Sequence, residues 1–240
     1  MSTPLAKRVE LLNKRYEGAA PQDILRASIR EEFPGRVALV SSFGTESAAL
    51  LHLIAQVDRA APVVFLDTGK LFGETKRYRD ELVALLGLTG VQSVTPDPEA
   101  LAARDARGVL WSQNPDACCA LRKVEPLARA LAPYDAWFTG RKAFQAATRT
   151  TLPLFEIENA RIKINPIVRW SKADLDGYFT AHNLPHHPLE ADGYLSIGCM
   201  PCTTRVEPGE DARAGRWRGS KKVECGIHLP AGQMPAQAES

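Results

Sequence analysis

Short apolar runs alternate with helical patterns along most of the chain, and this alternation limits the possible folds more than any other feature. Strand-like runs of four residues occur at 37–40, 63–66, 91–94 and 136–139. Between them, apolar residues recur at helical spacing over 48–57, 74–86 and 98–132. Because parallel strands need long crossover connections, usually helices, the alternation predicts an α/β fold with a doubly wound, mainly parallel sheet.

The two ends of the chain depart from this alternation. The first thirty or so residues read as helix with a break at Pro21, and 154–157 with 161–164 read as a hairpin. A last helix over 171–183 follows Ser171, whose side chain is a suitable N-cap with Asp174 three residues on. Regular periodicity stops after Pro185. We expect one α/β domain over 1–205, and over 206–240 a mobile C-terminal segment that lies on the surface or closes over a site.

Composition excludes several classes of protein. The 240 residues carry 30 Lys and Arg against 28 Asp and Glu, a net charge of +2 that gives no sign of a nucleic-acid partner. No run approaches the ~18 apolar residues of a membrane span. The first eighteen residues lack the apolar stretch of a secretory signal. We therefore expect a cytoplasmic protein that has no membrane partner and whose cysteines are reduced.

Two polar turns follow neighbouring strand-like runs. The first is Ser42-Phe43-Gly44-Thr45-Glu46-Ser47, and the second is Asp67-Thr68-Gly69. Each alone is also common as a turn that serves backbone geometry, and neither is a Walker A loop or a GxGxxG loop. Ligands of open α/β sheets bind outside the carboxyl ends of strands, where amides and hydroxyls at a helix N-terminus suit phosphate or sulfate. Together the two turns predict a nucleotide site.

Four of the five cysteines form two pairs. Cys118 and Cys119 are adjacent, and Cys199 and Cys202 form a C-x-x-C motif eighty residues later. Four thiolates suit either zinc or an iron–sulfur cluster. Neighbouring helical side chains diverge by about 100°, so adjacent cysteines would bind one centre only in a strained arrangement. Two buried apolar cysteines would be the alternative for this pair alone.

The fifth cysteine, Cys225, has Lys221, Lys222 and His228 nearby, and such groups favour a reactive thiolate. Arg213, Arg216 and Arg218 precede it. These cations would either hold an anionic substrate or form a solvated surface offset by nearby acidic residues. The residues by themselves therefore predict a nucleotide-binding protein with a four-cysteine metal centre and a candidate nucleophile at Cys225.

The two cysteine pairs, together with Glu-Cys-Gly-Ile-His at 224–228, resemble the assimilatory adenylyl-sulfate (APS) reductases. The resemblance covers about residues 36–228. It is supported by 42–47, 66–69, 139–142, 165–167, 209–211 and 215–217. The chain departs from the family at Gly140-Arg141-Lys142, where many relatives have Gly-Leu/Ile-Arg-Arg.

The resemblance implies a fold of the adenine-nucleotide alpha-hydrolase-like (Rossmann-like) type with an irregular C-terminal tail. It also implies a [4Fe–4S] cluster on Cys118, Cys119, Cys199 and Cys202. By the same resemblance, Cys225 attacks APS, releasing AMP and leaving an S-sulfocysteine, and thioredoxin or a similar dithiol then releases sulfite.

The resemblance further implies the residues that bind substrate. Lys123 would lie between cluster and substrate, and His228 would shape the surroundings of Cys225. The remaining candidates would line the nucleotide or hold its phosphate and sulfate oxygens; they are Ser42, Phe43, Gly44, Thr45, Glu46, Ser47, Asp67, Thr68, Gly69, Arg149, Arg213 and Arg216.

Three other functions remain open. The first is reduction of the 3'-phosphorylated substrate PAPS, although the relatives that reduce it share the C-terminal cysteine motif but lack the four cluster cysteines. ATP pyrophosphatases usually carry a Ser-Gly-Gly-x-Asp-Ser-type loop, which this chain does not. A zinc-stabilised nucleotide-binding protein without reductase activity is the third. We assign no role to His186, His187 or Arg205, and we expect a homo-oligomer.

Overall fold

A computed structural model describes residues 3–145, 151–219, 222 and 224–228 of the protein. Its centre is one six-stranded sheet in the order β3-β2-β1-β4-β6-β5, in which only β5 runs antiparallel to its neighbour. The strands are β1 Val37–Ser41, β2 Val63–Leu66, β3 Val91–Val94, β4 Ala136–Phe138, β5 Phe155–Glu158 and β6 Arg161–Ile164. The predicted doubly wound, mainly parallel sheet is confirmed.

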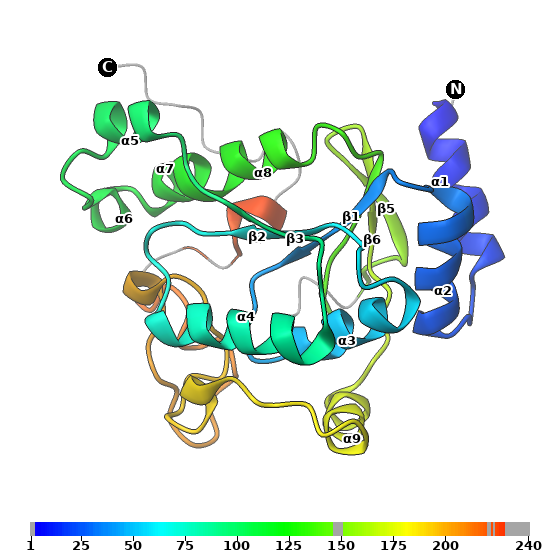
Figure 1. Ribbon diagram of the computed structural model, residues 1–240. Coiled ribbons are helices and arrows are strands. Elements are labelled where there is room, and N and C mark those ends of the chain that lie inside the picture. The colour runs from blue at the N-terminus through cyan, green and yellow to red at the C-terminus, as the bar shows by residue number, and fades with distance from the viewer. Residues whose placement is uncertain (1–2, 146–150, 220–221, 223, 229–240) are drawn as a thin grey trace.

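Helices cover both faces of the sheet (Figure 1), with α3, α4 and α9 on one face and α5 to α8 on the other. The helices are α1 Pro4–Arg15, α2 Pro21–Ala27, α3 Ser47–Val57, α4 Gly73–Leu86, α5 Pro98–Arg104, α6 Leu110–Gln113, α7 Pro115–Cys119, α8 Glu125–Ala130 and α9 Lys172–Ala181. Two π-helical turns, η1 Ser28–Glu32 and η2 Ala120–Val124, continue α2 and α7. Short 3₁₀ turns are η3 Ala143–Gln145, η5 Pro188–Glu190, η6 Met200–Cys202 and η7 Gly226–His228.

The alternation of side chains along the strands divides the core between the two faces. In β2, Val63 and Phe65 belong to the larger apolar cluster, whereas Val64 and Leu66 belong to the smaller one with Leu127. Successive strand residues point to opposite faces of a sheet, so a strand covered on both sides is apolar at every position. This is why the central strands appear in the sequence as continuous apolar runs.

Two predicted boundaries, the start of the last helix and the turn of the hairpin, can be followed in the structure. Ser171 and Asp174 form a reciprocal capping box at the start of α9, as predicted. The second strand of the hairpin is as predicted, whereas the first lies one residue later: β5 runs from Phe155 to Glu158, and the turn consists of Asn159 and Ala160, both at positive φ. Positive φ at both central residues is what the type I′ turn of a two-residue hairpin requires.

The polypeptide after α9 is irregular. One isolated β-bridge, Leu71 with Cys199, joins it to the β2–α4 connection, and a second, Thr203 with Arg216, pairs two of its own residues. Further along, η7 packs against η2 and α7 (Figure 1). The described part of the C-terminal segment therefore returns to the edge of the sheet where the first strands end. No helix of the described residues has the length and apolar character to cross a membrane.

Candidate active site

A cavity of about 300 Å³ lies where the direction of the strand order reverses. From β1 the chain proceeds to β2 on one side, while β4 lies on the other side of β1. Such a switch point leaves a crevice outside the strand ends, the usual ligand site of open α/β sheets. The cavity is lined by residues that follow β1 and β4, by residues of the β2–α4 connection, and by the C-terminal segments 195–198, 211–213 and 216–217 with Glu224, Cys225 and Ile227.

The loop after β1 forms much of this wall. Ser42, Gly44, Thr45, Glu46 and Ser47 line the cavity, and α3 begins at Ser47. A helix N-terminus with hydroxyls and amides facing a cavity favours an anionic group.

Phe43 is the exception within this loop. Its side chain is fully buried, packs edge-on against Phe65 with ring centroids 5.3 Å apart, and does not line the cavity. The residue has a positive φ, and its amide donates to Ser41 Oγ. Phe43 thus anchors the loop in the core while its neighbours face the cavity.

The residues after β4 place two buried cations at the same end of the sheet. Lys142 is 2% exposed and forms an ion pair with Glu46 at 2.6 Å, which joins the β4 loop to the β1 loop. Arg141 pairs with Glu156 and donates to Asn165 Oδ1. Carboxylates therefore partner both cations and hold them in place beside the cavity.

Cys225 also lines this cavity. Its thiol is buried, and Lys123 Nζ is 3.8 Å from its Sγ. The pKa of Cys225 is lowered well below its usual value, chiefly by a hydrogen bond from Cys119, against the cost of burial, and further by Lys123 and Arg216. The pKa of Lys123 is raised despite its burial, because it faces the thiols of Cys199, Cys225 and Cys119. The surroundings of Cys225 thus stabilise its thiolate form.

Ion pairs hold the segment that carries Cys225. Glu224 accepts from the Cys225 amide at 2.9 Å and pairs with Arg213 at 3.0 Å. The guanidinium of Arg216 stacks on the Trp217 ring at 4.4 Å and fills the space beside Gly198, where a Cβ would meet its Nη2 at 2.3 Å. Arg216 Nε is buried and has no hydrogen-bond partner among the residues described. Such a buried donor at the wall of a cavity is suited to a ligand.

The four paired cysteines line a second, small cavity behind Cys225, together with Lys70, Arg122, Lys123 and Arg216. Burial raises the pKa of Cys118 to about 11, with Cys199 and Cys202 contributing. Cys119 instead faces Cys225, and that hydrogen bond raises the Cys119 pKa. The adjacent cysteines thus point to different partners, the divergence expected of neighbours on a helix.

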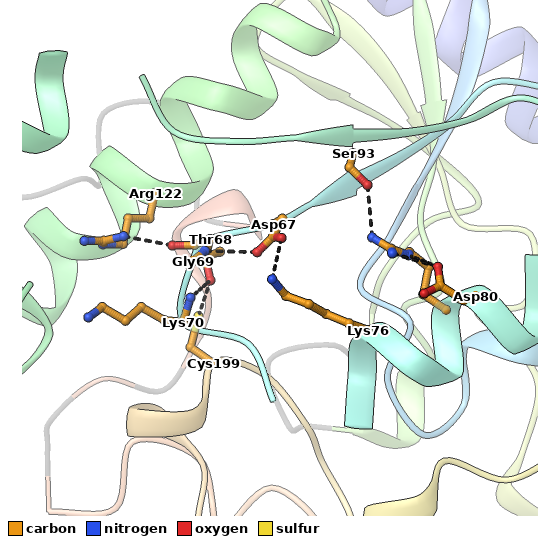
Figure 2. A network of polar contacts seen from close by, with 10 residues as sticks. Asp67, Thr68, Gly69, Lys70, Lys76, Asp80, Ser93, Arg122 and Cys199 are labelled. Carbon is orange, nitrogen blue, oxygen red and sulfur yellow. Dashed lines mark hydrogen bonds and ion pairs between the residues drawn. The ribbon is translucent and has the colours of Figure 1, made fainter. Parts of the chain in front are cut away.

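The turn after β2 lines neither cavity, but it is bonded to residues that line the second one (Figure 2). Thr68 Oγ1 lies 3.2 Å from Cys199 Sγ, and the Thr68 carbonyl accepts from Arg122. Asp67 pairs with Lys76 at 2.7 Å and caps the Gly69 amide. Asp67, Thr68 and Gly69 do not line the larger cavity.

The cysteine cavity carries the donors and charges that a metal centre requires. All five cysteines are free thiols, and the cations of the wall would balance thiolate charge. Within the described ranges, no group of three or more His, Cys, Asp or Glu side chains is arranged around one point that could hold a metal ion. The chemistry of the four donors therefore fits a zinc or iron–sulfur centre, while their arrangement here is not that of a closed site.

Some predicted residues fall outside this description. Arg149 lies in the undescribed range 146–150, and the side chain of His228 is also outside the described part. Of the two adjacent histidines, His186 is exposed beside Glu190, whereas His187 is 1% exposed and bonded to Thr75.

Several lining residues were not among the substrate-binding residues predicted from the sequence. They include the segment 195–198, Thr75, Asp211, Trp217 and Glu224. The segment 195–198 immediately precedes Cys199, and Glu224 precedes Cys225, so closeness to a cysteine motif was the available signal. Thr75 stands within a helix and carries no motif of its own.

Comparisons with known proteins agree over most of the chain. Residues 36–205 match the family described as "Phosphoadenosine phosphosulfate reductase domain". The "Adenosine 5'-phosphosulfate reductase" of Mesorhizobium japonicum is 56% identical over 225 residues, which cover 94% of this chain and 89% of that protein. The "Phosphoadenosine 5'-phosphosulfate reductase" of Gloeobacter violaceus is 39% identical over 225 residues, 92% of this chain and 93% of that one.

A solved structure is similar over a comparable length. The crystal structure of phosphoadenylyl-sulfate (PAPS) reductase from Candida auris aligns with a TM-score of 0.70 at 28% identity. The alignment covers 86% of this chain and 98% of that chain.

Proposed function

Because this chain belongs to the phosphoadenosine phosphosulfate reductase domain family, we propose that it reduces adenosine 5'-phosphosulfate (APS) to sulfite and AMP in assimilatory sulfate reduction. The protein is an enzyme, a reductase that acts on a sulfur group. The observation that carries the choice of nucleophile is the position of Cys225. It shares one cavity with the loop after β1 and has Lys123 within 3.8 Å of its sulfur.

In the proposed reaction, the Cys225 thiolate attacks the sulfur atom of APS. The bond between that sulfur and the bridging phosphate oxygen breaks, and AMP leaves with the electron pair. An S-sulfocysteine remains on Cys225. Thioredoxin or a similar dithiol attacks Cys225 Sγ, which releases sulfite and forms a mixed disulfide, and the second thiol of the partner restores the Cys225 thiol.

The charges around Cys225 suit this first step. Lys123 and Arg216 favour the thiolate over the thiol and would also attract the sulfate oxygens. Arg213 and Arg216 supply planar guanidinium groups that match sulfate or phosphate oxygens. The residues of the β1 loop that line the cavity, Ser42 and 44–47, would contact the nucleotide. Phe43, Asp67, Thr68 and Gly69 would support these positions from behind the cavity wall.

We further propose that Cys118, Cys119, Cys199 and Cys202 hold a [4Fe–4S] cluster. When bound, such a cluster would polarise the site electrostatically without itself exchanging electrons. The cations Lys70, Arg122 and Lys123 would offset its negative charge. Lys123 lines both cavities and would therefore connect cluster and substrate.

Mass spectrometry tests the covalent step. Incubation with APS in the absence of any thiol should add one sulfonate group to the peptide that contains Cys225, and a later addition of dithiol should remove it. The Cys225→Ser variant should acquire none. A sulfonate on any other cysteine, or none at all in the active wild-type protein, contradicts the mechanism.

PAPS is the alternative substrate, because a relative at 39% identity and a structural neighbour are named for it. We favour APS because the four cysteines are all present and because the relative at 56% identity is named for APS. Sulfite release from the two nucleotides, measured side by side, decides between them.

The remaining proposals concern the surroundings of the enzyme. Five free thiols are consistent with a reducing compartment, and we propose the cytoplasm. The homo-oligomer, the division at residue 205 and the roles of Arg149 and His228 stay predictions. A zinc-stabilised protein without activity is distinguished by metal content, as described below.

A further inference from the structure

Thr75, the third residue of α4, presents a buried hydroxyl at the wall of the larger cavity. The side chain is only 1% exposed. The wall that the β2–α4 connection contributes consists of Leu66, Leu71 and Thr75, none of which is charged. Thr75 is therefore the polar group of an otherwise apolar wall.

His187 holds this hydroxyl through a bond whose direction can be assigned. Its Nε2 lies 3.0 Å from Thr75 Oγ1, and its Nδ1 accepts from the Leu189 amide at 3.2 Å. A nitrogen that accepts a hydrogen bond carries no proton, so the proton of the neutral ring is on Nε2. His187 Nε2–H therefore donates to Thr75.

The surroundings keep the imidazole neutral and fixed. His187 is 1% exposed, and Tyr78 packs against it edge-on with ring centroids 5.0 Å apart. Burial lowers the His187 pKa to about 4, partly offset by Glu74. Tyr78 is in turn fixed by its bond to the Pro185 carbonyl at 2.7 Å.

Because Thr75 Oγ1 accepts from His187, its own hydrogen must be donated elsewhere. A hydroxyl has one donor, and no second hydrogen bond of Thr75 occurs within the described part of the chain. The open direction is the cavity. An apolar wall with one neutral donor fits the base or ribose of a nucleotide, whereas the charged end of the cavity around Cys225 fits phosphate and sulfate.

We propose that Thr75 is a specificity-determining residue that donates a hydrogen bond to the adenosine part of the bound nucleotide, and that His187 is its positioning residue. The proposal rests on the proposed nucleotide substrate but not on the covalent chemistry at Cys225. It gives a role to a histidine for which the sequence indicated none.

Equilibrium binding of AMP to the full-length protein tests the hydroxyl. Thr75→Val keeps the shape of the side chain and removes the donor, and it should weaken AMP binding about 5- to 10-fold, the effect of one neutral hydrogen bond. Thr75→Ser should bind within about twofold of wild type. Thr180→Val, on the exposed face of α9, is the matched control.

Two variants of His187 test the positioning. In His187→Gln, the amide nitrogen can replace Nε2 and donate to Thr75, whereas in His187→Asn the amide oxygen can replace only Nδ1. We expect His187→Gln to bind AMP with an affinity near that of the wild type, and His187→Asn to lose about as much AMP affinity as Thr75→Val. The double variant that combines His187→Asn with Thr75→Val should bind AMP no more weakly than Thr75→Val alone. Circular dichroism and thermal unfolding should show that each variant is folded.

Unchanged AMP affinity in Thr75→Val, or equal losses of AMP affinity in Thr75→Val and Thr75→Ser, would overturn the proposed role of Thr75 as a donor. Additive losses in the double variant overturn the role of His187. Sulfite release from APS by the wild-type protein is measured in parallel. A wild type that binds AMP but forms no sulfite refutes the proposed reductase activity and leaves the inference about Thr75 standing.

Discussion

The reactivity of Cys225 depends on residues that are distant in sequence. Cys119 and Lys123 come from the α7–η2 stretch, and Arg216 comes from the segment after the C-x-x-C motif. A thiolate in a buried position is costly unless opposite charge and hydrogen-bond donors compensate for lost hydration. If Cys119 binds a metal it can no longer donate to Cys225, so the cations would then carry the stabilisation.

Lys123→Met should therefore raise the pKa of the Cys225 thiol. A thiol reacts as its thiolate, which is lost as the pH falls through the pKa. Since the pKa is lowered in the wild type, alkylation of Cys225 should persist below pH 9, whereas in Lys123→Met the profile should move up by about one unit, a tenfold slower reaction at pH values below both pKa values. Iodoacetamide labelling, resolved by peptide mass spectrometry, measures this. Lys123→Arg should alkylate at nearly the wild-type rate. A pH profile that is unchanged in Lys123→Met would contradict the conclusion that Lys123 lowers the pKa of Cys225.

Asp105, the residue after α5, and Arg122 of η2 form a deeply buried ion pair. Their side chains are 1% and 8% exposed, and Arg122 Nη2 is 2.6 Å from the carboxylate. Burial opposes ionisation of Asp105, but Arg122 and the Leu110 amide lower its pKa. The carboxylate therefore stabilises the fold above the pKa of the unfolded chain, about 3.9, and this contribution is lost as the pH falls through the lower pKa of the folded state.

We expect Asp105→Asn to lower the free energy of unfolding by about 3 kcal/mol at pH 7, because a buried guanidinium loses its partner charge. The difference from wild type should stay constant from pH 8 to pH 5 and shrink below about pH 4. Urea unfolding at several pH values measures it. A difference that grows toward acid would contradict the sign of the pKa shift.

At the scale of the elements, local capping and packing decide where helices begin. The hydroxyl of the N-cap Ser171 accepts from the Asp174 amide, and the Asp174 carboxylate accepts from the Ser171 amide. The two bonds satisfy amides that would otherwise lack partners in the first turn of α9. Leu175 and Phe179 then bury one face of this helix in the larger apolar cluster.

Ser171→Ala should cost about 1 kcal/mol of stability, the usual effect of removing a helix cap. Chemical denaturation followed by fluorescence measures the change. Lys172→Ala, at an exposed position that loses only the pair with Asp176, serves as the control and should cost less than about 0.5 kcal/mol. Equal effects of the two substitutions would show that the capping box contributes nothing.

At the scale of the whole molecule, the cysteine cavity joins two parts of the chain that are eighty residues apart. Cys118 and Cys119 end α7, whereas Cys199 precedes the turn η6 and Cys202 ends it. A metal centre held by both pairs would crosslink these segments in the folded state and not in the unfolded one. Its binding free energy would therefore add to the stability of the fold.

Protein purified without oxygen should contain about four iron and four sulfide per chain if the proposed cluster is correct. Removal of the metal should lower the Tm, and Cys199→Ser should lose the iron. Zinc without sulfide would instead favour the nucleotide-binding protein without reductase activity. Metal analysis and thermal unfolding of the same sample make both comparisons.

The sequence predicted the fold more completely than the site. The strands and their helices follow from local patterns, because a strand buried on both faces is apolar throughout and helix ends carry caps. The cavity depends on contacts that no local pattern encodes. That Phe43 turns inward while Ser42 and Gly44 face the cavity depends on packing against Phe65. That Thr75 and His187 meet depends on how α4 lies beside η5, 112 residues further along the chain.

The π-turn η2 directly follows the adjacent cysteines. A π-turn can be regarded as an α-helix into which one residue has been inserted. Deletion of one residue from 120–124 would convert the turn to regular helix and rotate Cys118 and Cys119 by about 100° relative to Lys123 and α8. Loss of one residue here would therefore move both cysteines away from their partners, whereas a substitution would leave the backbone position of the cysteines unchanged. Sequence change in descendants of this protein should proceed here by replacement, with the length of the segment held constant.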